Sequence, residues 1–63
     1  MKEVTQKEFY DAIGPLNVHP HITNGKWPYT ADFLTPTRQL RGRSVDTGKR
    51  TDYGHEKKYY LPE

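Results

Sequence analysis

Histidine is the residue type in this chain best suited to metal chemistry. His19 and His21 stand two apart, so their side chains point the same way in an extended segment, and His55 could complete a metal site with them. However, Pro20 bends the path between the first two histidines, and no carboxylate lies within several residues of that pair. The chain has no cysteine for a zinc–thiolate site. We therefore expect no metal and no other cofactor.

A segment rich in glycine resembles a phosphate-binding loop only superficially. Five residues separate Gly42 from Gly48, whereas that loop needs four. Arg50 also stands where a serine or threonine should bind magnesium. The spacing instead favours a strand that runs into a turn.

Residues for nucleophilic catalysis are present, but they have no specific spacing. Such a trio is recognised by its geometry and not by its content. A core this small can hardly frame a substrate pocket of the usual size. We therefore expect a non-catalytic protein, although a nucleophile and base could be drawn from Ser44, Thr47 or Thr51 with His55 and Asp52.

Basic and aromatic residues together form the most informative pattern. Residues 38–58 contain seven basic and three acidic residues, whereas residues 1–31 contain three of each. Arg41 and Arg43 are two apart, so we expect them on one sheet face unless a bulge separates them. Tyrosine, tryptophan and arginine are enriched at the centres of protein interfaces. The candidate binding residues are Trp27, Tyr29, Arg41, Arg43, Lys49, Arg50, Lys57, Lys58 and Tyr59.

Two kinds of partner fit these candidates. The first is a protein, or a second copy of the chain, bound to an aromatic and arginine-rich sheet face. The alternative is a nucleic acid, because arginine and lysine contact phosphates while aromatic rings stack on bases. A plainer interpretation is a solvated sheet face whose lysines protect an edge. We expect no membrane partner, and the sequence indicates no small-molecule substrate.

Length and composition indicate one small domain over residues 1–63. Only 32% of the residues are hydrophobic, but eight aromatic residues argue against disorder. No apolar run is long enough to span a membrane, and the first residues lack the hydrophobic core of a signal peptide. Together with the absence of cysteine, this predicts a cytoplasmic protein.

The first element predicted along the chain is a short helix over Gln6–Ile13. Thr5 and Glu8 have the spacing of a capping box, in which each side chain bonds the main-chain N–H of the other residue. Gly14 followed by Pro15 predicts the end of the helix, with the glycine in a left-handed conformation. Because two turns are not stable alone in water, the helix must pack on other elements.

Three segments predict strands. Trp27–Leu34 alternates aromatic or apolar residues with others, as a half-buried strand does. Arg38–Asp46 is less regular, and a bulge at Gly42 would place Leu40 and Val45 on one face. Glu56–Leu61 is rich in tyrosine. We expect the polar residues 47–55 to form a loop.

We also expect residues 15–26 to form a loop, which could fold back over the sheet face opposite the helix. Asn24-Gly25 favours a hairpin between Val18–Thr23 and Lys26–Leu34, but Pro20 and Pro28 would each remove a donor from that ladder. Short connections between strands favour antiparallel pairing. The predicted fold class is α+β, with one short N-terminal helix packed on a three-stranded antiparallel sheet.

Overall fold

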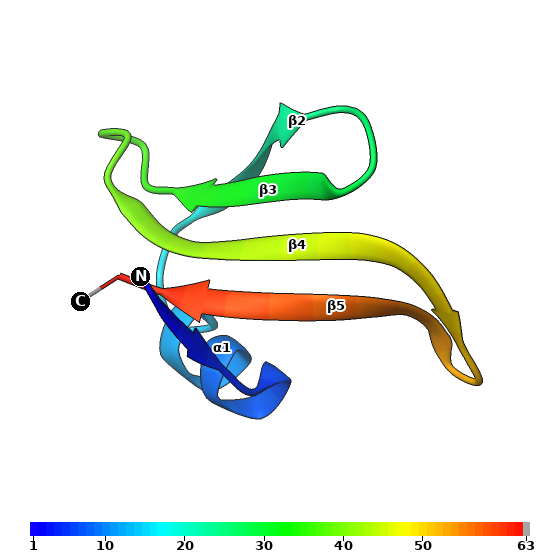
Figure 1. The fold of residues 1–63 in the computed structure, drawn as a ribbon. Coiled ribbons are helices and arrows are strands. Elements are labelled where there is room, and N and C mark those ends of the chain that lie inside the picture. Colours follow the sequence, from blue (N-terminus) through cyan, green and yellow to red (C-terminus); the bar gives the residue numbers. More distant parts are fainter. Residues whose placement is uncertain (63) are drawn as a thin grey trace.

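The computed structural model describes residues 1–62, and Glu63 lies outside the described residues. One five-stranded antiparallel sheet dominates the fold, and one short helix packs on it (Figure 1). The prediction of a three-stranded α+β domain is therefore wrong, since most residues lie in strands. The spatial order of the strands is β1-β5-β4-β3-β2. The elements are β1 (Lys2–Val4), α1 (Gln6–Ile13), β2 (His19–Asn24), β3 (Tyr29–Leu34), β4 (Leu40–Thr51) and β5 (Gly54–Leu61).

Helix α1 has the predicted bounds and the predicted start. The Glu8 N–H donates to Thr5 Oγ1 and the Thr5 N–H donates to Glu8 Oε1, both at 3.2 Å. The Thr5 N–H and the Thr5 hydroxyl both donate to the Glu8 carboxylate, and these bonds lower the pKa of Glu8 below its usual value. The end of the helix differs from the prediction, because Gly14 has a right-handed conformation (φ −55°) and donates to the carbonyl of Tyr10 at 2.8 Å.

Strand β2 replaces much of the loop predicted for residues 15–26. It pairs antiparallel with β3, and residues 25–28 connect the two strands. Pro20 does not prevent this pairing because β2 lies at the edge of the sheet, where a missing donor is tolerated. Since residues 19–24 belong to the sheet, the alternative in which they fold back over its face is also wrong.

Strand β1 was not predicted. Its three residues carry little pattern of their own, and they pair with Tyr59–Leu61 at the other end of the chain. Lys2 lies opposite Leu61, and Val4 lies opposite Tyr59. Such a short strand forms because β5 offers it main-chain hydrogen-bonding groups. No local pattern in the sequence shows that β5 lies beside these residues.

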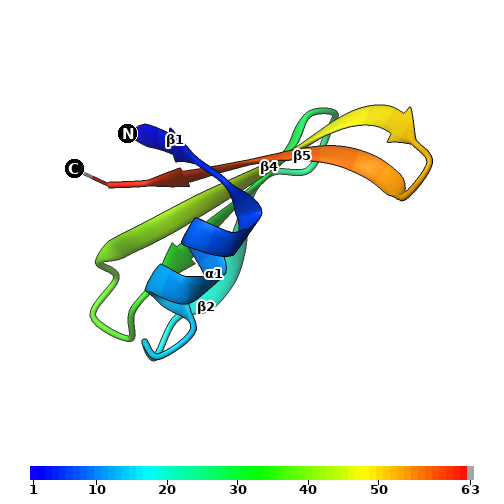
Figure 2. The ribbon, with the colours of Figure 1, turned by 90° about the horizontal axis from the view of Figure 1, so that it is seen from below.

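The predicted loop over residues 47–55 is instead the end of a long hairpin. Strand β4 continues to Thr51, and β5 starts at Gly54. Two glycines with positive φ allow this path: Gly48 (φ 79°) within a register shift, and Gly54 (φ 121°) beside the turn. The hairpin extends beyond α1 (Figure 2). Its residues are therefore polar on both faces, which makes them resemble a loop in the sequence.

A bulge in β4 lies next to its predicted position. Phe33 pairs with Gly42 and Leu34 pairs with Leu40, so Arg41 is the extra residue. The shift places Leu40 and Val45 on the same face of the sheet, as the sequence pattern required. It also separates Arg41 from the regular alternation that contains Arg43.

The core lies between α1 and one face of the sheet. Among residues 1–62, the buried hydrophobic side chains are those of Phe9, Ile13 and Tyr59, and Val4 and Phe33 are among the partly buried ones beside them. Among the described residues, α1 is the only helix, so the opposite face of the sheet has no helix over it (Figure 2). We call these two faces the helix side and the open side. With eight residues, α1 is too short to cross a membrane.

Candidate functional site

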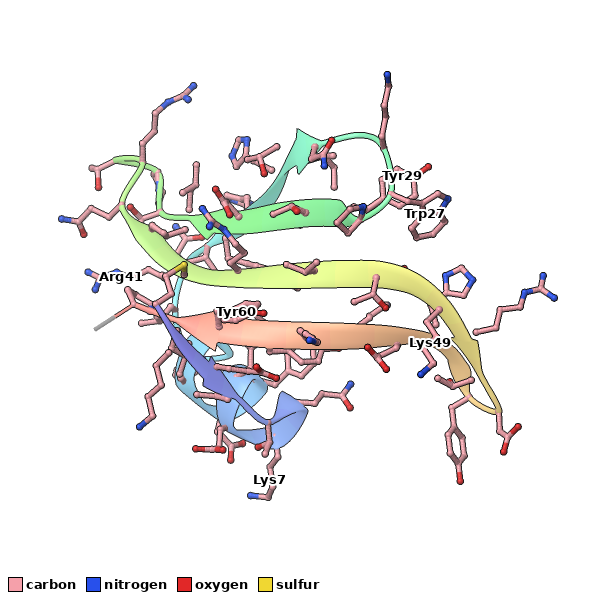
Figure 3. The ribbon with its side chains drawn as sticks, in the orientation of Figure 1. Lys7, Trp27, Tyr29, Arg41, Lys49 and Tyr60 are labelled. Atoms are coloured by element: carbon pink, nitrogen blue, oxygen red, sulfur yellow. The ribbon has the colours of Figure 1, made fainter. Side chains whose placement is uncertain are left out.

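The structure divides the nine predicted binding residues between several places. Trp27 belongs to the β2–β3 connection and Tyr29 begins β3, and their ring centroids lie 4.2 Å apart. Arg41 lies at the opposite end of the sheet, and Lys49 lies on the far part of the β4–β5 hairpin (Figure 3). The predicted residues therefore do not form one continuous face.

Arg43 is on the open side and is engaged within the sheet. Its Nε and Nη2 donate to the two carboxylate oxygens of Asp32, which lies opposite it on β3. The hydrogen bond to Asp32 raises the pKa of Arg43 above its already high value. A bidentate arginine–carboxylate pair of this kind is among the stronger polar contacts in proteins. The positive charge of Arg43 is therefore largely balanced by Asp32 within the sheet.

Tyr59 is a core residue and not a surface contact. Its ring lies 5.0 Å from that of Phe9 and 5.8 Å from that of Tyr10. Burial raises the pKa of the Tyr59 hydroxyl, and the neighbouring Tyr10 hydroxyl raises it further. The sequence pattern predicted Tyr59 as a binding residue because nothing in the sequence showed that the helix would cover its ring.

The other basic candidates are exposed but do not gather on one face. Lys57 and Lys58 are neighbours on β5, so their side chains point to opposite sides of the sheet. Lys57 is on the helix side, because it pairs with Asp46, whereas Lys58 is on the open side. Lys49 and Arg50 are exposed on the last part of β4.

The strongest surface feature is a group of apolar and aromatic side chains on the helix side, which come from α1, β2, β3 and the β2–β3 connection. Ile22 is 66% exposed, Trp27 51%, Tyr10 50% and Tyr29 37%. Tyr10, Ile22 and Tyr29 border one shallow hollow of about 180 Å³. We call these four residues the aromatic surface. The sequence pointed to Trp27 and Tyr29, but it did not place Ile22 or Tyr10 with them, because β2 was expected to be a loop.

Polar contacts under Trp27 fix this end of the sheet. Asp46 Oδ1 accepts a hydrogen bond from the Gly48 N–H at 2.9 Å, and Asp46 Oδ2 lies 3.3 Å from His55 Nδ1. The Trp27 ring packs edge-on against the His55 ring, with centroids 5.2 Å apart. Burial alone would raise the pKa of Asp46, but the bonds from Gly48 and His55 and the positive charge of Lys57 outweigh it, so the pKa is lowered.

The three histidines considered as metal ligands lie on two different sides of the sheet. His19 and His21 lie on the open side at the β2 edge, whereas His55 is on the helix side of β5. Within residues 1–62, no three histidine, aspartate or glutamate side chains are close enough to hold a metal ion. The hydroxyls of Thr47 and Thr51 donate to the main-chain carbonyls of Glu56 and Gly54.

No protein-family description, no curated protein and no solved structure is significantly similar to this chain.

Proposed function

We propose that this chain is a non-catalytic module that binds a protein partner through the aromatic surface. The observation that carries the proposal is the exposure of four large side chains on one part of the helix side. The buried core of the described residues holds only three hydrophobic side chains, so the exposed set is large for this domain. Contiguous exposed apolar groups of this kind mark interaction sites in small proteins.

The way Trp27 is held supports the same proposal. Its ring packs on Tyr29 and His55 and lies directly over Gly48, so its position is fixed although half of it is exposed. A side chain that is ordered before binding loses less conformational freedom when a partner covers it. Tryptophan and tyrosine are also the residue types that contribute most at interface centres.

The basic residues give less support to a nucleic-acid interface. Arg43 already pairs with Asp32, Lys57 and Lys58 point to opposite sides, and Arg41 lies at the far end of the sheet from Lys49. A surface that binds phosphates needs several free positive charges along one path. We retain nucleic acid as the competing hypothesis that the experiment below must separate.

The absence of cysteine from all 63 residues supports a reducing compartment, and we propose the cytoplasm as the place where this module acts.

Site-specific photocrosslinking tests the proposal. A photoreactive amino acid at Ile22 should give discrete protein adducts in a cell extract, and Trp27→Ala should reduce their yield severalfold. The same photoreactive group at Arg41, an exposed residue at the opposite end of the sheet, is the matched control and should not give those adducts (Figure 3). Nuclease treatment should leave the adducts unchanged. Adducts that disappear with nuclease, together with oligonucleotide binding that weakens steeply with salt, would support the nucleic-acid hypothesis instead.

A further inference from the structure

Strand β5 is paired with β4 along most of its length, whereas its other side is paired only in part. Strand β1 lies beside Tyr59–Leu61, and within residues 1–62 no strand pairs with Gly54–Lys58 on that side (Figure 1). Four of these five residues are exposed, and Glu56 is half-buried. The open stretch begins where β1 ends and where the chain turns into α1.

The direction of the main-chain groups in this stretch follows from a hydrogen bond to β4. The Glu56 carbonyl accepts from Thr47 Oγ1 at 3.2 Å, so it points toward β4. Main-chain groups in an antiparallel strand alternate between its two sides. The N–H and C=O groups of His55 and Lys57 therefore point outward, away from β4. They continue the row in which Tyr59 pairs with Val4.

A groove follows the same edge. It has a volume of about 650 Å³, and β1, the start of α1 and the β4–β5 hairpin contribute to its walls. This size is within the usual range for binding sites. Residues that line it include Glu3, Thr5, Tyr53, His55, Lys57 and Lys58.

The other sheet edge is protected against an added strand. Strand β2 contains Pro20, and its register shifts around Thr23. Proline and bulges are two of the devices that blunt exposed edges. The outer edge of β1 has only three residues. The stretch Gly54–Lys58 has no proline, and the register shift opposite Glu56 places its extra residues on β4 and not on β5. It is also longer than the three-residue outer edge of β1.

The charges of this stretch fit an acidic partner segment better than a second copy of this chain. A two-fold antiparallel pairing centred on Glu56 places two glutamates opposite each other. A pairing centred on Lys57 places two lysines opposite each other, although it also places Glu56 opposite Lys58 on both sides of the centre. Like charges directly across an antiparallel pair are unfavourable. Acidic side chains opposite Lys57 and Lys58 would be favourable on both sides of the sheet.

We propose that Gly54–Lys58 accepts an extended acidic segment of a partner protein as an additional strand of the sheet. The main-chain groups of His55 and Lys57 would supply the hydrogen bonds, and the two lysines would select acidic residues at adjacent positions. Adding a strand to an open edge is a recurrent mode of peptide recognition. This proposal depends on the edge of β5 and not on the aromatic surface, so either can fail while the other stands.

A labelled peptide tests the proposal directly. The probe is the capped peptide Thr-Val-Asp-Glu-Val-Thr-Val, and its binding is followed by fluorescence anisotropy. We expect saturable binding, and binding about tenfold weaker or worse when lysines replace its two acidic residues. Methylating the amide nitrogens of one alternate set of residues should abolish binding, whereas methylating the other set should not, because only one set faces β5.

Protein variants locate the site. Lys57→Glu and Lys58→Glu should each weaken binding about tenfold, and Lys49→Glu, which makes the same change on β4, should not. The fluorescence of Trp27, the single tryptophan, checks that each variant is folded.

Three results would overturn the proposal. The first is no saturable binding of the probe to the folded protein. The second is equal binding of the two methylated peptides, because side-chain contacts alone would then explain the affinity. The third is a dimer in solution that Lys57→Glu alters, because a second copy would then occupy the edge.

Discussion

Trp27 shows how a side chain can be exposed and still be fixed in place. A Cβ atom at Gly48 would lie 3.0 Å from Cε3 of the Trp27 ring, so a side chain at residue 48 would crowd the indole in its position on β4. The positive φ of Gly48 also disfavours other residues there. Gly48 thus has two effects: it allows the register shift in β4, and it leaves space for the Trp27 ring.

Asp46 makes the stability of this region depend on pH. Its pKa in the folded protein is below the usual value, so its ionised form stabilises the fold at neutral pH, and that contribution is lost as the pH falls below about 4. We expect Asp46→Asn to lower the melting temperature at pH 7, and the difference from the unchanged protein to shrink on acidification. Thermal unfolding from pH 7 to pH 2 measures this, with Asp52→Asn in the exposed turn as the control. A difference that stays constant over this range would contradict the assignment.

At the scale of elements, the start of α1 is the feature that the sequence specifies most completely. All partners of the capping box lie within four residues, and the structure has both of its hydrogen bonds. We expect Thr5→Ala to lower the free energy of unfolding by about 1 kcal/mol, which corresponds to about 4–8 °C in melting temperature for a domain of this size. Calorimetry measures the shift. Gln6→Ala in the same turn is the control, and an equal shift in that variant would mean that the cap is not responsible.

Gly42 determines how closely α1 approaches the sheet. A Cβ atom at this position would lie 2.7 Å from Cε1 of Phe9, whose ring is fully buried, so the ring or the helix would have to shift. We expect Gly42→Ala to lower the free energy of unfolding by about 1–3 kcal/mol through this overlap. Urea denaturation measures the loss. Gly25→Ala, where an added Cβ contacts nothing within 4 Å, is the control. A Gly42→Ala protein as stable as that control would show that the helix can shift outward without cost.

The elements that were missed depend on pairing between distant residues. The pairing of Lys2 with Leu61 leaves no trace in either segment alone. Pro20 argued against a strand because only the finished sheet shows that β2 is at its edge. The same limit applies to the candidate site. Its residue types could be predicted, but the pairing of Arg43 with Asp32 and the burial of Tyr59 follow from register and from the helix above them.

For the whole molecule, shape and core size are linked. The chain measures 34 × 24 × 17 Å, a flat form in which one short helix covers part of one sheet face. A domain of this length buries only about 60% of the surface that its unfolded chain exposes. The aromatic surface and the open edge of β5 are therefore exposed because the chain has too few residues outside the sheet to cover them.

Because the core is so small, the whole fold depends on Phe9. Its ring is fully buried and contacts the rings of Tyr10, Phe33 and Tyr59, so it joins α1 to β3 and β5. Replacing a buried phenylalanine with alanine costs about 3–5 kcal/mol, whereas a domain of this length has roughly 3–9 kcal/mol in total. We expect Phe9→Ala to be largely unfolded at 25 °C, with a collapsed near-ultraviolet circular dichroism signal. Tyr53→Ala, at a fully exposed residue of the β4–β5 turn, should leave that signal and the urea midpoint unchanged. If Phe9→Ala instead unfolded cooperatively with the same urea midpoint as the unchanged protein, the sheet would be stable without the packing of its helix.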